Sequence, residues 1–236
     1  MIRSEMIAHL PVPVRNWLTN LGLIGTEKTY AVRLKQHAKM KMKPDQDKWS
    51  EAFAEQYYTI SQPAFLWKVD MQMMPFLDVV GRDRFIDGKG GMLIKLLALI
   101  PVVNVKDNEK INSAAMQRYL AEIVWFPAAA LNPFITWEEI DNRSAKAIMT
   151  YKGTRGSGIF YFNEQGEFLK FKALRYFGGE DDATLKEWII TATESSVMHG
   201  IRIPVQCEAT WKLPTGDWTW LKLKITDIEY NNTNKF

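Results

Sequence analysis

The polar side chains with the clearest spacing for a binding or catalytic site lie in the segment RYLAEIVWFP, residues 118–127. A helix there places Arg118, Glu122 and Trp125 along one face at steps of four and three, and Tyr119 lies three residues before Glu122. Two interpretations stay open. The charged pair is either an ion pair on a helix surface, worth roughly 0.2–0.5 kcal/mol, or a polar gate beside an apolar pocket.

A second candidate is the glycine-rich stretch DGKGG, which begins at Asp87. A phosphate-binding P-loop needs two glycines with four residues between them, followed by Lys and then Ser or Thr. Here Lys89 lies between Gly88 and Gly90, and no hydroxyl residue follows. Asp87-Gly88 is therefore predicted to form a turn. The apolar run that follows, Met92 to Val103, is either a strand or a short helix.

Residues for metal binding or nucleophilic catalysis are scattered along the chain. The three histidines, His9, His37 and His199, fall in different predicted elements and have no metal-ligand spacing. The single cysteine, Cys207, lies on the apolar side of a predicted strand, where a thiolate is disfavoured. No catalytic residue, metal site or cofactor is predicted.

Composition favours a single globular domain over residues 1–236. The chain is 47% hydrophobic and 24% charged, which suits a large buried core. Its 9 Trp, 8 Tyr, 12 Phe and 11 Met residues indicate that this apolar interior is built from bulky side chains. The net charge of +3 is too small for a dedicated nucleic-acid binder, so nucleic acid is not expected as a partner.

The sequence as given predicts a cytoplasmic protein, because it shows neither a signal peptide nor a membrane span. Met92 to Val103 is much shorter than the roughly 20 apolar residues that a spanning helix needs, and Lys95 and Pro101 interrupt it. An N-terminal anchor missing from this chain would instead place the protein outside the cytoplasm.

Alternation of apolar and polar side chains predicts strands along most of the chain. From Tyr30 to Lys43, one side carries Met40 and Met42, and the other carries a basic stripe. The basic stripe comprises Arg33, Lys35, His37, Lys39, Lys41 and Lys43. It is either a solvated sheet face or a weak contact surface for anionic membranes. The apolar side of the strand near residue 65 comprises Phe65, Trp67, Val69, Met71 and Met73.

The second half of the chain has the same alternation. Short turns separate its strands, so neighbouring strands are predicted to be antiparallel, because parallel neighbours need long crossovers. The strands are expected at Ser144–Tyr151, Gly158–Phe162, Phe168–Ala173, Trp188–Thr193, Ile203–Leu213 and Trp218–Tyr230.

Few helices are expected. Asn112 or Ser113 can cap a helix that runs to Phe126, before Pro127, and a shorter helix is expected at Val14–Leu21. Because helices and strands do not alternate as βαβ units, the predicted class is α+β.

Several segments give the chain a whole-length resemblance to an uncharacterised bacterial family of unknown function. They include LPVPVRNWLTNLG, GRDRFIDGKGGMLIKLLALIPVV and HGIRIPVQCEATWKLPTG. More distantly, the order of meander, IDGKG turn, central helix and second meander resembles Lol-type lipoprotein carriers. That resemblance implies a curved open antiparallel sheet, a half barrel, with helices over its concave face. It also implies a cavity for an apolar ligand or acyl chain.

The sequence and the resemblance together predict a helical leader (1–26), a sheet (27–230) with a central helix (113–126), and a frayed tail (231–236). The expected function is non-catalytic binding or carrying of a lipid or other apolar molecule. A cavity of at least ~300 Å³ is expected between sheet and helix. The alternatives are an interaction domain with a filled core and an enzyme on the same scaffold. The expected ligand-binding residues are Met40, Met42, Phe65, Trp67, Met71, Met73, Arg118, Tyr119, Glu122 and Trp125.

Overall fold

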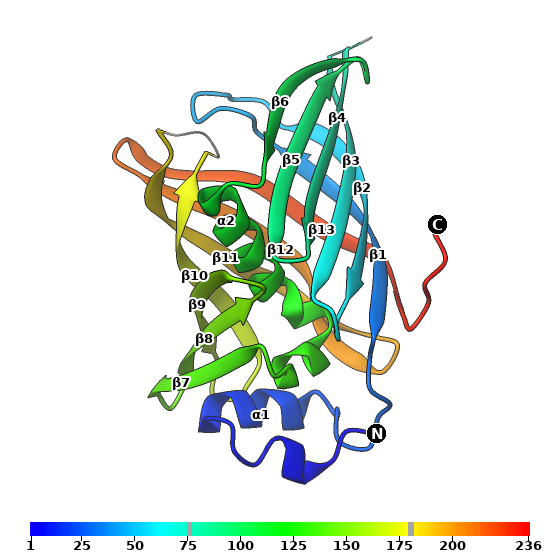
Figure 1. The fold of residues 1–236 in the computed structure, drawn as a ribbon, viewed down its shortest axis with the longest axis vertical. Coiled ribbons are helices and arrows are strands. Elements are labelled where there is room, and N and C mark those ends of the chain that lie inside the picture. Colours follow the sequence, from blue (N-terminus) through cyan, green and yellow to red (C-terminus); the bar gives the residue numbers. More distant parts are fainter. Residues whose placement is uncertain (75–76, 179–181) are drawn as a thin grey trace.

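The computed structural model describes residues 1–74, 77–178 and 182–236; the side chains of residues 73, 74 and 77 also lie outside this description. Thirteen strands of the described chain form one antiparallel sheet, which curves around a central helix (Figure 1). The first six strands are β1 (Ala31–Met40), β2 (Ser50–Thr59), β3 (Ala64–Met74), β4 (Leu77–Ile86), β5 (Lys89–Leu96) and β6 (Ile100–Lys106). The other seven are β7 (Ile135–Asp141), β8 (Ser144–Tyr151), β9 (Thr154–Phe162), β10 (Phe168–Phe177), β11 (Thr184–Met198), β12 (Ile201–Leu213) and β13 (Gly216–Tyr230).

Two α-helices accompany the sheet. The helix α1 (Val12–Asn20) packs against β7 and β8 at one end of the molecule, and α2 (Glu109–Glu122) lies inside the curve of the sheet (Figure 1). Three short 3-10 helices cover Ser4–Met6, Ile123–Trp125 and Pro127–Leu131. The predicted α+β class and half-barrel architecture are confirmed.

The strand order explains why α2 crosses the concave face. The order is β6-β5-β4-β3-β2-β1-β13-β12-β11-β10-β9-β8-β7, so the first and last strands pair in the middle. Their register runs from Val32 opposite Tyr230 to Met40 opposite Leu221. Strands β6 and β7 are the two edges, and the segment between them contains α2. The chain must therefore pass from one edge to the other, and it does so across the open side.

The predicted antiparallel pairing is confirmed for every strand pair in the described chain. Alternation in β1 follows the sequence pattern: Val32, Leu34, Ala38 and Met40 are buried, and the charged residues between them are half-buried or exposed. Gln36 is also buried on the same side.

The DGKGG stretch forms a hairpin turn and a helix-packing site. Asp87 and Gly88 have φ values of 53° and 77°, and they connect β4 to β5, as predicted. The apolar run after them forms β5 and β6, so the strand alternative is correct. A Cβ at Gly90 would lie 2.3 Å from the carbonyl oxygen of Ile111, so glycine is needed here for α2 to approach β5.

The predicted start of the central helix was wrong by four residues. The helix begins at Glu109, because the side chain of Asn108 accepts a hydrogen bond (2.9 Å) from the backbone N–H of Ile111. Asn112, the expected cap, instead accepts a hydrogen bond from the backbone N–H of Gly90. Beyond Glu122 the chain tightens into 3-10 turns, so residues 123–126 are not α-helical.

The structure differs from the prediction in two further places, an additional strand and the C-terminal tail. The strand β7, at one edge of the sheet, was not expected. The C-terminal residues 231–236, expected to be frayed, lie against the outer face of β1 and β2. There the Arg33 guanidinium lies 4.2 Å from the centre of the Phe236 ring and donates hydrogen bonds to the carbonyls of Asn234 and Lys235.

Candidate functional site

A cavity of about 640 Å³ lies between α2 and the concave face of the sheet. Strands β10–β13 form one side of it, strands β4–β6 contribute to the other, and one face of α2 lies along it. The volume exceeds the ~300 Å³ expected from the sequence and falls within the range of small-molecule sites, about 300–1,000 Å³. The predicted cavity between sheet and helix is therefore present.

The cavity wall is rich in tryptophan. Of the 9 tryptophans in the chain, five line the cavity: Trp125, Trp188, Trp211, Trp218 and Trp220. Trp211 lies opposite Trp188 in the pairing of β11 with β12, and opposite Trp218 in the pairing of β12 with β13. These cross-strand positions bring large rigid rings together on one face of the sheet.

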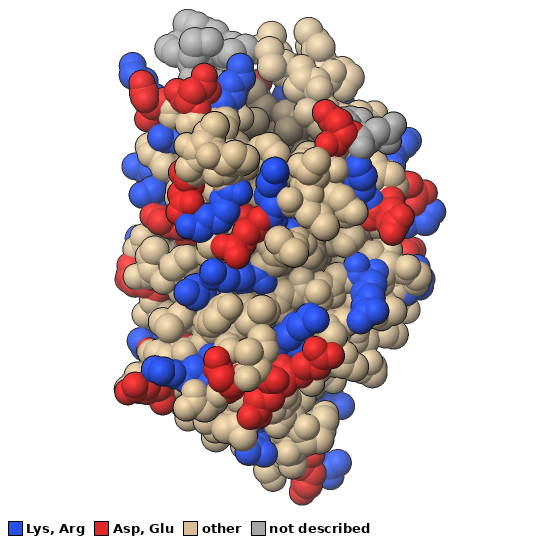
Figure 2. Space-filling view, turned by 90° about the vertical axis from the view of Figure 1, so that its left-hand side faces the viewer, with Lys and Arg blue, Asp and Glu red and all other residues tan. Residues whose placement is uncertain are grey.

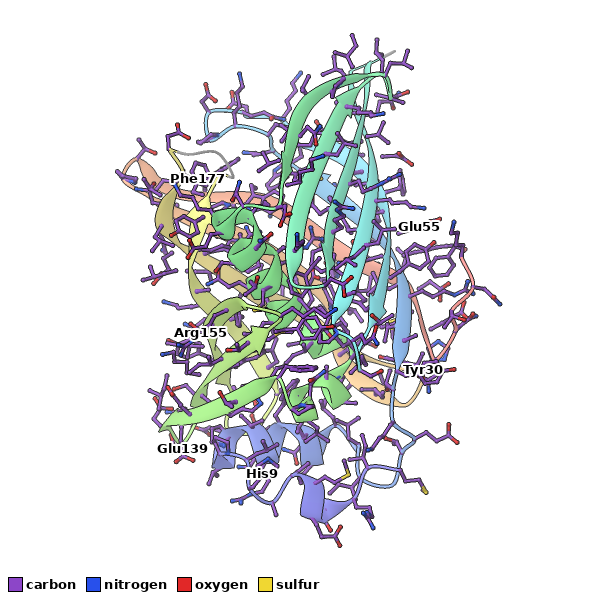
Figure 3. The ribbon with its side chains drawn as sticks, viewed as in Figure 1. His9, Tyr30, Glu55, Glu139, Arg155 and Phe177 are labelled. Atoms are coloured by element: carbon purple, nitrogen blue, oxygen red, sulfur yellow. The ribbon has the colours of Figure 1, made fainter. Side chains whose placement is uncertain are left out.

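Phe177 closes one end of this tryptophan wall. Its ring centre lies 5.1 Å from that of Trp211 and 6.0 Å from that of Trp218, both edge-on. Figure 3 places Phe177 at the end of β10, away from Arg155 on β9. Both Phe177 and Gly178 line the cavity, and because Phe177 is half-buried and Gly178 is exposed, they form part of its rim.

A buried ion-pair network borders the cavity on α2. Arg118 donates from Nη1 to Asp83 Oδ2 (2.6 Å) and from Nε to Glu122 Oε1 (2.8 Å). The other oxygen of Glu122 accepts hydrogen bonds from Gln56 Nε2 (2.9 Å) and from the Tyr58 hydroxyl (3.0 Å). The Glu122 carboxylate is thus held from three sides, and the network joins α2 to β2 and β4.

Burial dominates the electrostatics of this network. It raises the pKa of Glu122 above its ordinary value, and the charge of Arg118 limits the rise. The pKa of Asp83 is raised for the same reason and limited by the same cation. Burial alone would lower the pKa of Arg118, but Glu122 and Asp83 outweigh it and raise the pKa.

A second arginine, Arg175 on β10, lines the cavity without such partners. Its guanidinium carbon lies 4.6 Å from the ring centre of Trp188 and 5.6 Å from that of Trp211. Its Nε donates to the carbonyl oxygen of Ala114 (3.1 Å). Among the described residues, no carboxylate lies within ion-pair distance of Arg175. Burial, together with the charge of Arg118, lowers the pKa of Arg175 to about 10, so the side chain stays cationic at neutral pH.

Comparison with known proteins identifies the family. Residues 8–230 match the model described as "Family of unknown function (DUF6920)". The chain belongs to this family. A search of curated proteins found no match for this DUF6920 member. Among solved structures, the LolA superfamily protein NE2245 from Nitrosomonas europaea is similar, with 10% sequence identity and a TM-score of 0.48. The match covers 95% of this chain and 96% of that one.

The structure separates the ten ligand-binding residues expected from sequence into two groups. Arg118, Glu122 and Trp125 line the cavity of this DUF6920 member. Tyr119 is fully buried and donates from its hydroxyl to the carbonyl oxygen of Thr59 (3.1 Å). It therefore contributes to packing.

The expected apolar ligand residues of β1 and β3 pack in the core and do not line the cavity. Met40, Phe65, Trp67 and Met71 are each at most 7% exposed, and Met42 packs partly buried beside them. The side chain of Met73 lies outside the described residues. The strand parity expected for this set is correct, but the Arg118 guanidinium covers the rings of Phe65 and Trp67.

Most of the cavity residues that the sequence did not predict lie on β10 to β13. The spacing of Trp218 and Trp220, two residues apart, places both rings on one strand face and was an available signal. Cys207 also lines the cavity, and burial raises the pKa of its thiol to about 12, so the thiol is not an activated nucleophile.

The basic stripe on the outer face of β1 is interleaved with acidic partners. Arg33 pairs with Glu229 (2.6 Å), and Glu51 contacts both His37 (2.6 Å) and Lys39 (3.3 Å). On a different face, the left-hand side of Figure 1 as seen in Figure 2, Lys and Arg side chains are likewise interspersed with Asp and Glu side chains. In the described part of the chain, no cluster of three or more His, Cys, Asp or Glu residues is arranged to hold a metal ion. None of the described helices has the length and apolar character of a membrane span.

Proposed function

We propose that the protein binds an apolar or amphiphilic small molecule in the cavity beside α2, without transforming it. The observation that carries this proposal is the cavity of about 640 Å³ with five tryptophans in its wall. A domain whose concave face served only to form a filled core would leave no such space, because protein interiors pack with few voids larger than a water molecule.

The distribution of polar groups supports the same function. Ligand sites are mostly apolar, with a few polar groups that fix orientation. Besides Asp182 and Glu208, the cavity lining carries four charged side chains among tryptophan, aliphatic and alanine side chains: Asp83, Arg118, Glu122 and Arg175. Three of these four charged groups already bond to one another, which suits a fixed wall more than a proton-transfer site.

Native mass spectrometry of freshly purified protein, followed by titration of a fluorescent fatty acid, tests the proposal. We expect saturable binding of one probe molecule per chain. Trp218→Ala, which removes part of the cavity wall, is expected to weaken probe binding by about tenfold, because roughly 25 cal/mol is lost per Å² of apolar contact.

The matched control is Trp49→Ala. Trp49 is absent from the cavity wall, and its ring lies 5.1 Å from Lys41 Nζ and 5.4 Å from Lys222 Nζ. This variant should bind the probe as the native protein does. Absence of both co-purifying ligand and saturable probe binding would show that the proposal is wrong.

A further inference from the structure

Within the cavity, two carboxylates contact one arginine, and no described carboxylate contacts the other. Arg118 uses its Nε and Nη1 donors on Glu122 and Asp83. Arg175 has five N–H donors, as every guanidinium has, and its Nε donates to the carbonyl oxygen of Ala114. No described carboxylate lies within ion-pair distance of Arg175. Asp83 and Glu122 act on Arg175 only through space, where they limit the fall of its pKa. A bound anion in contact with the guanidinium would stabilise its charge further, because charge-assisted hydrogen bonds are strong in a mostly apolar site.

We propose that the ligand is a long-chain amphiphile with one anionic headgroup, and that Arg175 binds this headgroup. This inference rests on the proposed function and adds to it the chemistry of the ligand's polar end. The headgroup is a carboxylate or a phosphate, since a guanidinium binds both in a bidentate manner.

A second observation, independent of Arg175, also points to a ligand with hydrogen-bond acceptors. The indole N–H groups of Trp188, Trp218 and Trp220 are buried and have no acceptor among the described residues. All three tryptophans line the cavity, and the Trp188 ring lies directly against Arg175. Buried donors are normally bonded, so three unpartnered donors in one wall fit a ligand that supplies oxygen atoms.

The shape of the cavity suits an extended chain. Its lining on α2 runs from Ile111 through Ala114 and Arg118 to Ala121, a distance of about 15 Å along the helix axis. Arg175 contacts Ala114, and the rim residue Phe177 follows two positions later on the same strand. The headgroup therefore lies near the rim, and the chain extends along α2 toward the wall at its far end.

That far end is mostly apolar, and the Glu122 carboxylate beside it is already bonded to Arg118, Gln56 and Tyr58. It is formed by the indole of Trp125, just beyond α2, and by aliphatic side chains of β13 such as Leu221 and Leu223. Trp125 is 5% exposed and donates its indole N–H to the carbonyl oxygen of Pro204 (3.0 Å), so it has no donor left for a ligand. The tryptophan at the far end is satisfied, whereas Trp188 beside Arg175 is not.

Competition against a bound fluorescent fatty acid tests the headgroup. Four amphiphiles with the same chain are compared: palmitate, hexadecyl phosphate, hexadecanol and hexadecyltrimethylammonium. We expect the two anionic compounds to bind at least about tenfold more tightly than hexadecanol, because a charge-assisted hydrogen bond is lost in the alcohol. The cationic compound is expected to bind most weakly. Acetate and inorganic phosphate are expected not to displace the probe.

The outcomes separate this inference from the proposed function. If hexadecanol binds as tightly as palmitate, the anionic headgroup is excluded and the cavity remains an apolar binding site. If no amphiphile binds, the proposed function itself fails. If inorganic phosphate displaces the probe as well as hexadecyl phosphate does, the site recognises the free anion and the amphiphile is excluded.

Variants of Arg175 test the residue. Arg175→Gln is expected to weaken palmitate binding by about tenfold while leaving hexadecanol binding unchanged, which also reports that the cavity is still folded. Arg175→Lys keeps the charge and should retain most of the preference for palmitate over hexadecanol. Arg155→Gln, at an exposed position on β9 (Figure 3), is the matched control and should bind palmitate as the native protein does. Equal palmitate affinities in Arg175→Gln and Arg155→Gln would overturn the assignment.

Discussion

Two arginines inside the half barrel each lie over two aromatic rings, but their surroundings differ. In the N-terminal half of the sheet, the Arg118 guanidinium carbon lies 5.1 Å from the Phe65 ring centre and 4.6 Å from that of Trp67. Carboxylates hold this guanidinium on two sides, and the rings beneath it are at most 5% exposed.

In the C-terminal half, Arg175 lies over Trp188 and Trp211 in a similar way, at 4.6 Å and 5.6 Å. No described carboxylate pairs with it, and the space next to it is open. The comparison shows how similar cation–aromatic contacts serve two purposes. Arg118, which two carboxylates contact, covers packed core rings at the border of the cavity. Arg175, which no described carboxylate contacts, lies in the cavity wall where it can receive an anion.

Removing each arginine should give very different losses of stability. Arg118→Met leaves Asp83 and Glu122 buried without a cation, which is expected to reduce the free energy of unfolding by about 3–5 kcal/mol. Arg175→Met leaves no carboxylate unpaired, so the loss should be below about 1 kcal/mol. Urea unfolding at pH 7 measures both. Similar losses for the two variants would contradict the difference in charge balance.

The tryptophan beneath Arg118 and a tryptophan of the cavity wall should differ in the same direction. Trp67 is 5% exposed and donates its indole N–H to Gln36 Oε1 (2.8 Å), so Trp67→Ala should cost about 3–5 kcal/mol. Trp218 is only half-buried, and its indole N–H has no acceptor among the described residues, so Trp218→Ala should cost less than about half of that. Thermal unfolding of the two variants provides the measurement. A larger loss for Trp218→Ala than for Trp67→Ala would contradict the assignment of Trp67 to the packed core and of Trp218 to an open cavity wall.

The pH dependence of stability sharpens the comparison. Burial raises the folded-state pKa of Asp83 and Glu122, so the folded state binds more protons than the unfolded state between the ordinary and raised values. These carboxyls therefore contribute to the free energy of unfolding at pH values below their unfolded pKa, near 4. This contribution is lost as the pH rises through their folded pKa values.

Arg118→Met should raise both folded pKa values further, since it removes the cation that limits them. Its loss of stability relative to the native protein is thus expected to grow from pH 4 to pH 7. That of Arg175→Met should grow less, because Arg175 lowers the pKa of Asp83 without contacting it. Urea unfolding at several pH values checks the two slopes. If the loss of unfolding free energy in Arg118→Met is larger at pH 4 than at pH 7, this account of the carboxyl pKa values is wrong.

The sequence predicted the strands well because alternation depends on a local property. Each side chain of a strand faces one side or the other, so the pattern of β1 could be read directly from residues 30–43. The antiparallel pairing also followed from local turns such as Asp87-Gly88 and His199-Gly200, both of which have positive φ values.

The location of the cavity could not be predicted in the same way. Met40 and Trp67 were expected to contact ligand because they lie on the concave side, and parity places them there correctly. Which part of that side remains open depends on where α2 crosses, and this follows from the non-local pairing of β1 with β13. Arg175 was missed because its position beside Trp188 requires the register of β10 with β11.

On the outer face of β1, paired and unpaired cations can be compared in the same way, and the expected effect on vesicle binding is small. Arg33 is paired with Glu229 much as Arg118 is paired with Glu122, whereas Lys35 is exposed and lies 4.3 Å from the Phe236 ring. Because much of the basic stripe is paired, we expect only weak, salt-sensitive binding to anionic vesicles, lost in a Lys35→Gln, Lys39→Gln variant. Co-sedimentation at low salt measures it, and equal binding to neutral vesicles would leave the stripe as a solvated face.

Quenching of tryptophan fluorescence by a brominated fatty acid tests the central claim most directly, because bromine quenches only indoles that it contacts. We predict saturable quenching by dibromostearate at one molecule per chain, reversed by excess stearate. The quenched fraction should fall in a Trp218→Phe, Trp220→Phe variant and remain unchanged in Trp49→Phe, since Trp49 is outside the cavity wall. Quenching that does not saturate, or that falls equally in both variants, would contradict the assignment of this cavity as an amphiphile-binding site.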